Sequence, residues 1–162
     1  MLEVAQVHDV PAEILAVVPD HDYVDLFKAV VATGTGTDPE RWARATVEGA
    51  PELGRLLAWR LACGLRPDHR VGNVGGWTID GRGKNWIRLA AAGPVMRARM
   101  VFWIEGAHVS FATFVRYDRR IAFYIWWSVS HVHRAVAPRF LAGGVRRMER
   151  HAVSRGERRG SR

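Results

Sequence analysis

The sequence is poor in cysteine, in lysine and in long hydrophobic runs. Cys63 is the only cysteine among the 162 residues, so no disulfide bond can form within the chain. No run reaches the roughly 18 apolar residues that a membrane-spanning helix needs. The first twenty residues lack a basic segment and contain Glu3 and Asp9, unlike a signal peptide. These absences favour a cytoplasmic protein that does not enter a membrane.

The composition is that of a folded domain, with 48% hydrophobic and 25% charged residues. The length predicts a single domain over residues 1–150. The formal net charge is +8, and residues 146–162 hold seven arginines and two glutamates, which is most of that excess. We expect residues 151–162 to form a basic, disordered tail. Arginine tails can bind phosphate backbones, but the solvated tail is the favoured interpretation over a nucleic-acid partner.

Hydrophobic periodicity predicts an α+β protein. A strand is expected at 22–32, a helix from Asp38-Pro39-Glu40 to about Glu48, and a second helix from Pro51 to Gly64. Strands are then expected at 75–80 and 84–90 around a turn at 80–83, at 94–105, at 107–117 and at 121–129. Ser130 is expected to cap a long C-terminal helix that Pro138 kinks. This order predicts an antiparallel meander covered by the last helix.

Several segments resemble the START-like superfamily, also called SRPBCC or polyketide cyclase-like. They are DYVDLF at 22–27, Trp42, PELGRLLAWR at 51–60 and FYIWWSVSHVHRAVAPRFL at 123–141. Within that superfamily the chain is similar, over residues 20–148, to a bacterial group of domains of unknown function. The resemblance implies a helix-grip fold, in which a curved antiparallel sheet wraps the C-terminal helix around an elongated pocket for an apolar small molecule. Our five or six strands are fewer than the seven usual in that fold, so one strand is hidden near 66–76 or the sheet is reduced.

Aromatic residues are dense for this length, with seven tryptophans. Such rings can pack a core or wall a ligand site, and for the set as a whole we favour a part in the pocket. On residues 94–105 one face is wholly apolar, and Arg97, Arg99 and Trp103 share the other. The candidate substrate-binding residues are Trp86, Trp103, Trp126, Met100, Phe102, Phe111, Thr113, Tyr124, Trp42 and Trp59.

Four residues are candidates for acid–base or oxyanion chemistry: His133, His131, Arg99 and Asp25. Each has a structural alternative. Arg99 can face solvent, Asp25 can form a structural ion pair, and the histidines can bond to local backbone. Two histidines at i and i+2 of a helix point apart, so no metal site and no cofactor is expected.

The sequence therefore predicts that the protein binds a hydrophobic or aromatic small molecule. The alternative on the same scaffold is a cofactor-free cyclase, isomerase or lyase of secondary metabolism, acting on a polyketide-like substrate. Apart from the apolar ligand, a homodimer is the one partner that this interpretation leaves open.

Overall fold

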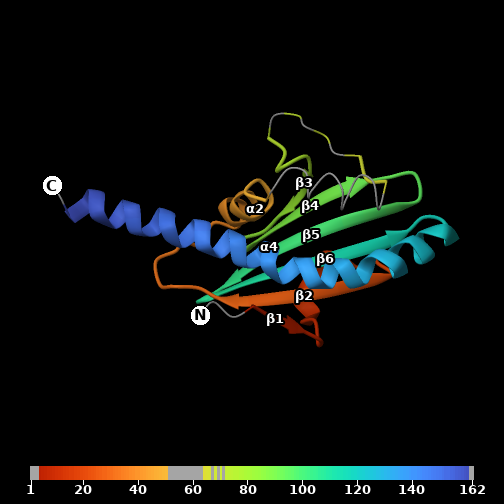
Figure 1. Ribbon diagram of the computed structural model, residues 1–162, viewed down its shortest axis with the longest axis horizontal. Helices are drawn as coiled ribbons and strands as arrows, with labels where there is room; N and C mark the ends of the chain where they lie inside the picture. The colour runs from red at the N-terminus through yellow and green to blue at the C-terminus, as the bar shows by residue number, and fades with distance from the viewer. Residues whose placement is uncertain (1–3, 51–63, 67, 69, 71, 161–162) are drawn as a thin grey trace.

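The computed structural model describes residues 4–50, 64–66, 68, 70 and 72–160, with side chains as far as Ser154. It shows an α+β chain with one six-stranded antiparallel sheet in the order β1-β2-β6-β5-β4-β3 (Figure 1). The strands are β1 Val4–Val7, β2 Tyr23–Val30, β3 Thr78–Arg82, β4 Trp86–Ala92, β5 Met96–Glu105 and β6 His108–Tyr117. The helices are α1 Ala12–Val17, α2 Pro39–Val47 and α4 Arg120–Gly160.

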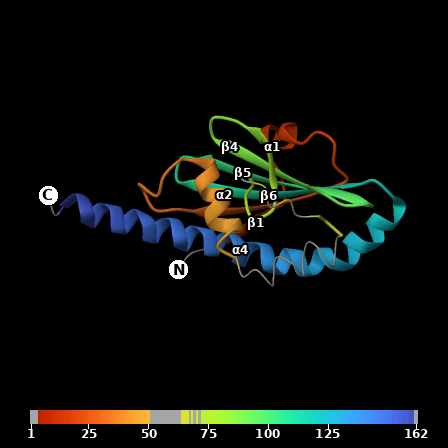
Figure 2. The same ribbon diagram turned by 90° about the horizontal axis from the view of Figure 1, so that it is seen from above.

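The two faces of the sheet carry different helices. Figure 2 shows α1 on one side of the sheet and both α2 and α4 on the other. Side chains alternate between these faces along each strand, so Phe27 packs with α2 and α4 whereas Leu26 packs with α1. The apolar row predicted on β5 lies in the larger core, beneath α2 and α4: Met96, Ala98, Met100 and Phe102.

The helix expected after the first strand is confirmed as α2. Asp38 is its N-cap, and the Asp38 carboxylate accepts a 3.0 Å hydrogen bond from the Glu40 backbone N–H. Pro39 occupies the first turn, where its missing N–H costs nothing. The second expected helix, from Pro51 to Gly64, lies almost wholly outside the described residues.

The predicted meander is confirmed as β3 to β6, joined by antiparallel pairing throughout. The first turn is later than expected, because β3 continues through Gly81 to Arg82. Neither β1 nor α1 was expected from the sequence, because both elements are short. Near residues 66–76, where a strand could have been hidden, the described residues make only isolated bridges, Arg66 with Ala92 and Val74 with Trp77.

The strand expected at residues 121–129 is wrong, because these residues form the first turns of α4. Ser130 therefore lies inside the helix, where its hydroxyl donates to the Trp127 carbonyl at 3.1 Å. Ala122, Trp126 and Ser130 recur at a spacing of four and are buried. This helical spacing places one side of the segment against the sheet and leaves the other apolar side chains outside.

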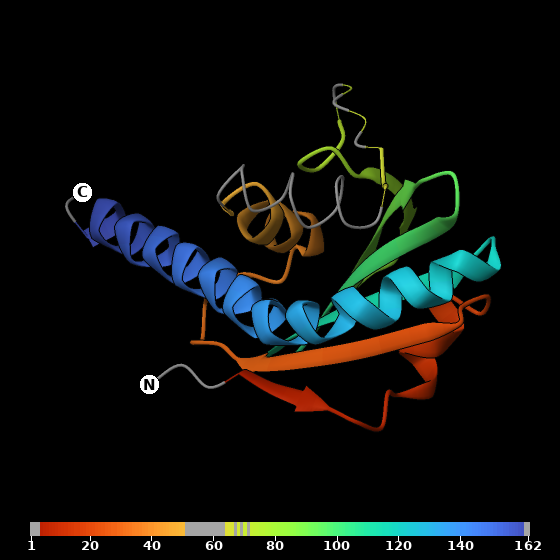
Figure 3. The same cartoon turned by 45° about the vertical axis from the view of Figure 1, so that its right-hand side comes forward.

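The long helix α4 crosses the sheet and changes direction near its middle, in the part of the chain that contains Pro138 (Figure 3). A proline inside a helix removes one backbone donor and crowds the preceding turn, as expected from the sequence. The helix then continues to Gly160, through residues for which we expected a disordered tail. Among the described helices, none has the length and apolarity needed to cross a bilayer.

Candidate functional site

A polar cluster lies between β2 and α4, inside the larger core. We call Tyr23, Asp25, Thr113, Trp126 and His133 the buried polar cluster. The Asp25 side chain is only 2% exposed, and its Oδ2 accepts a 2.8 Å hydrogen bond from the Tyr23 hydroxyl. The same Oδ2 lies 3.2 Å from Nε2 of His133, whose side chain is 10% exposed. One carboxylate oxygen thus serves two partners, one from its own strand and one from the long helix.

The rings of the cluster pack around this carboxylate. The Trp126 ring meets the Tyr23 ring edge to face at 5.1 Å and lies 5.4 Å from the His133 ring. Trp126 and His133 lie seven residues apart on α4, which is two helical turns, so they face the sheet together. The fold therefore fixes the imidazole between an indole and a carboxylate.

Tyr23 is held in its neutral form. Burial raises the pKa of its hydroxyl, and the negative charge of Asp25 and the hydrogen bond to that carboxylate raise it further. The charge of Arg134 acts in the opposite direction but less strongly. The surroundings of Tyr23 therefore favour the neutral phenol, which donates a hydrogen bond to Asp25.

Three polar atoms of the cluster are buried without a hydrogen-bond partner: Oδ1 of Asp25, Oγ1 of Thr113 and Nε1 of Trp126. Asp25 and Thr113 are direct cross-strand neighbours on β2 and β6, so their side chains share one face. Buried polar groups nearly always have partners, and leaving one unpaired costs about 1–3 kcal/mol. Together these atoms offer one acceptor, one donor and one hydroxyl that can do either.

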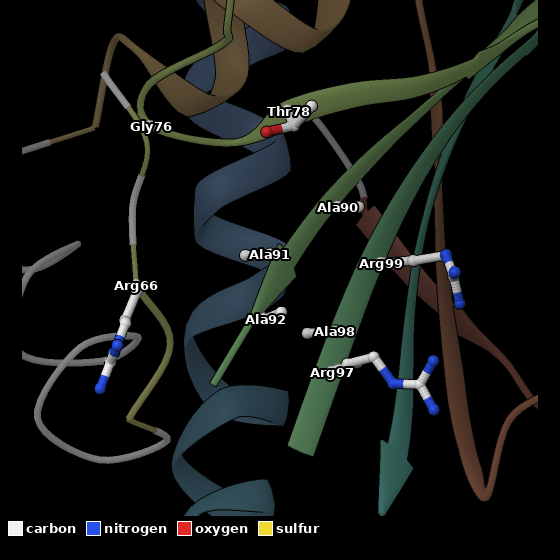
Figure 4. A pocket seen from close by; sticks show the side chains of 9 residues that line it. All are labelled: Arg66, Gly76, Thr78, Ala90, Ala91, Ala92, Arg97, Ala98 and Arg99. Atoms are coloured by element: carbon white, nitrogen blue, oxygen red, sulfur yellow. The ribbon is translucent and has the colours of Figure 1, made fainter. Parts of the chain in front are cut away.

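A groove of about 380 Å³ opens at the edge of the same sheet. Alanines from β4 and β5 form its floor, and Figure 4 shows Arg97 and Arg99 projecting from β5 away from Ala91 and Ala92. Its lining residues are Arg66, Gly76, Thr78, Ala90, Ala91, Ala92, Arg97, Ala98 and Arg99.

The groove and the buried polar cluster both include residues of one cross-strand row of the sheet. Cross-strand pairing aligns Ala91 with Ala98, Ala98 with Val115 and Val115 with Tyr23. Neighbouring strands lie about 4.8 Å apart, and β6 separates β5 from β2. The backbone of Ala98 is therefore roughly 10 Å from the backbone of Tyr23. Because Ala91 and Ala98 have small side chains, this row rises little above the sheet where it lines the groove.

The candidate residues from the sequence divide between several places. His133, Asp25, Trp126 and Thr113 meet in the cluster, and Met100 is the cross-strand neighbour of Thr113. Phe102, Phe111 and Trp42 are buried in the same core, where Phe102 and Phe111 pack at 5.1 Å. Trp59 lies outside the described residues.

Five candidates lie elsewhere, four of them ring-bearing side chains and the fifth Arg99. Trp86 and Trp103 stack with each other at 6.5 Å on the opposite face, beside α1. There Trp103 is partly buried against the smaller core. Tyr124 is 67% exposed on the outside of α4. His131 is exposed as well, and its ring lies against Trp127. They cannot join the cluster, because the alternation of side chains along a strand and their rotation around a helix point them away from it.

Arg99 also lies on the opposite face, as in the solvent-facing alternative. Its guanidinium pairs with Asp80 at 3.1 Å, and the same carboxylate binds Arg88 at 2.8 Å. Arg97 makes a bidentate pair with Asp118. The arginines of this face thus pair with two carboxylates, and Arg88 and Arg99 share that of Asp80.

The structure brings together no metal ligands within its described part: it holds no group of three or more His, Cys, Asp or Glu side chains suited to an ion. The residue that sequence reasoning missed is Tyr23. Its spacing of two from Asp25 on a predicted strand was a usable signal, because such neighbours share a face.

A comparison with known protein families, with characterised proteins and with solved structures finds no match for this chain. The resemblance to the START-like superfamily stays a prediction.

Proposed function

We propose that the protein binds an apolar small molecule that carries at least one hydroxyl or carbonyl oxygen. The observation that supports this is the set of three buried polar atoms without partners, on Asp25, Thr113 and Trp126. A ligand oxygen can accept from the indole N–H, and a ligand hydroxyl can donate to the free carboxylate oxygen. The ligand body would lie along the alanine row toward the groove, in the arrangement of a helix-grip pocket.

The burial of these groups explains why a ligand would be chosen for its oxygen. A site with unpaired buried polar atoms discriminates against a hydrocarbon, because the hydrocarbon leaves those atoms unpaired. The surrounding side chains, such as Met100 and Phe111, are apolar and match the rest of the molecule.

The test compares 2-naphthol with naphthalene as probes, by fluorescence titration of the purified protein. The wild-type protein should bind 2-naphthol more tightly, by about tenfold, which corresponds to one net hydrogen bond in a buried site. Thr113→Val and Trp126→Phe should reduce that preference, whereas Thr46→Val should leave it intact. Thr46 is the matched control because its hydroxyl is equally buried and without a partner, but it lies on α2.

Equal affinity of the wild-type protein for both probes would refute the proposal. Ala98→Leu gives a second test, since a larger side chain in the row between groove and cluster should weaken both probes alike. Native mass spectrometry of freshly purified protein can show whether a small molecule of this class is already bound.

A second candidate function is acid–base catalysis on the same scaffold, and it is favoured by the contact of His133 with Asp25. A carboxylate beside an imidazole orients the ring and selects its tautomer. In this proposal His133 removes a proton from the carbon between two carbonyl groups of a linear polyketide. The enolate carbon then forms a bond to a second carbonyl carbon of the same chain, and that carbonyl oxygen takes the proton back from His133 as a hydroxyl. This hydroxyl and the remaining proton of the attacking carbon leave as one water, which gives a ring double bond.

The enzyme candidate is tested by mass spectrometry of a linear poly-β-ketone incubated with the protein. Conversion should appear as the loss of one water, and His133→Gln should abolish it. Arg99→Gln is the control, because Arg99 lies on the opposite face in an ion pair with Asp80. If the probe is returned unchanged, only binding remains.

A further inference from the structure

The first half of α4 presents an unusual outer surface. Six large apolar side chains project from it and are between 48% and 67% exposed. We call this set the outer aromatic face: Ile121, Phe123, Tyr124, Trp127, Val132 and Val136. Scattered apolar residues are normal on a protein surface, but six large exposed ones within residues 121–136 of one helix are a concentration typical of a binding surface.

The charged side chains of this stretch of α4 itself have one sign. The sequence has no aspartate or glutamate from residue 119 to residue 148, whereas it has six arginines there. Arg119, Arg120 and Arg139 are exposed next to the apolar side chains. An ordinary solvated helix mixes both signs, so a one-sided set of charges indicates a partner of the opposite sign.

We propose that the outer aromatic face docks onto an anionic lipid surface. Trp127 and Tyr124 have an apolar body and a polar tip, which suits them to the boundary between head groups and acyl chains. Arginine side chains at the border reach the lipid phosphates. The helix would lie in the plane of the interface and would not span the bilayer.

Charge decides between this partner and a second copy of the chain. Two copies that met through this face would bring their arginines together with no carboxylate from residues 119–148 to neutralise them. Like charges in an interface oppose association. The six side chains are each about half exposed or more, so a surface can reach them.

The experiment is co-sedimentation of the full chain with vesicles of phosphatidylcholine alone and with about one third phosphatidylglycerol. The wild-type protein should bind the anionic vesicles and bind the neutral ones much more weakly. The double variant Tyr124→Ser/Trp127→Ser should lose binding by about tenfold or more, because it removes most of the aromatic contact. Arg120→Gln/Arg139→Gln should lose the preference for anionic lipid.

Val153→Ser is the matched control, because Val153 is 64% exposed on the same helix but lies beyond the outer aromatic face. It should bind as the wild type does, and circular dichroism should show that every variant is folded. Three results would overturn the proposal. The first is no binding to anionic vesicles, and the second is equal binding by the aromatic double variant. The third is a wild-type dimer, by light scattering without lipid, that the double variant converts to monomer.

Discussion

At the scale of single residues, the decisive feature is the buried carboxylate of Asp25. Burying a charge is costly unless partners replace the lost hydration. Asp25 gains such partners on Oδ2 only, from Tyr23 and from His133, and Oδ1 stays without a hydrogen bond. The half-satisfied carboxylate is what makes the buried polar cluster a site rather than an ordinary part of the core.

The raised pKa of Tyr23 predicts a loss of stability at alkaline pH. The folded state favours the neutral phenol, so its stabilising effect is complete below the ordinary tyrosine pKa of about 10 and is lost as the pH rises above it. Tyr23→Phe should therefore flatten the fall in unfolding free energy between about pH 9 and pH 11. Urea unfolding across this range measures the effect.

Tyr117→Phe is the comparison for this prediction. Burial and the charge of Asp22 raise the pKa of Tyr117, so its removal should change the slope in the same direction. A slope in Tyr23→Phe as steep as in the wild-type protein would mean that solvent reaches the Tyr23 hydroxyl.

At the scale of the elements, α2 and α4 touch through glycine. A Cβ at Gly144 would lie 2.0 Å from Oγ1 of Thr46 and 3.1 Å from its backbone Cα. Arg147, one turn further along α4, donates to the carbonyls of Ala45 and Gly49 at the C-terminal end of α2. A side chain at position 144 would push the two helices apart.

Gly144→Ala should therefore lower the free energy of unfolding, by about 1–3 kcal/mol, as overpacking does. Gly143→Ala is the matched control, since its Cβ would meet only the end of the long Arg147 side chain, at 3.2 Å, which can shift by a few tenths of an ångström. That substitution should stabilise by up to about 1 kcal/mol, because alanine favours a helix over glycine.

Chemical denaturation of the two variants measures this difference. If both substitutions stabilise the protein, the close approach of α2 and α4 at Gly144 is wrong.

At the scale of the whole molecule, the described side chains of α4 stabilise the fold as far as Met148. Met148 is the last buried side chain among those described on this helix. Glu149 accepts a hydrogen bond from the Ala32 backbone, which follows β2. From Arg150 to Ser154 the side chains are exposed, apart from the half-buried Ala152.

A chain shortened to residues 1–150 should keep the free energy of unfolding of the full chain. A chain shortened to 1–145 should lose about 2–5 kcal/mol, because it loses the burial of Met148 and the bonds of Arg147 to α2. Urea unfolding distinguishes the two. A large loss already in the longer of these chains would show that residues 151–162 contribute to the fold.

The sequence alone determined the elements whose signals are local. The cap at Asp38 and Pro39 defines the start of α2, and the alternation along residues 96–105 defines which face of β5 is buried. These signals depend on neighbours a few residues apart, so they can be recognised without knowledge of any distant contact.

The tertiary structure decided what depends on distant partners. Residues 121–129 are apolar on all sides, so they suit a strand or a helix equally until the sheet selects the side that carries Ala122 and Trp126. Asp25 and His133 were both visible as candidates, but only the crossing of α4 over β2 brings their side chains within 3.2 Å. The reason is physical: a periodic pattern records which side of an element is apolar, but not which other element covers it.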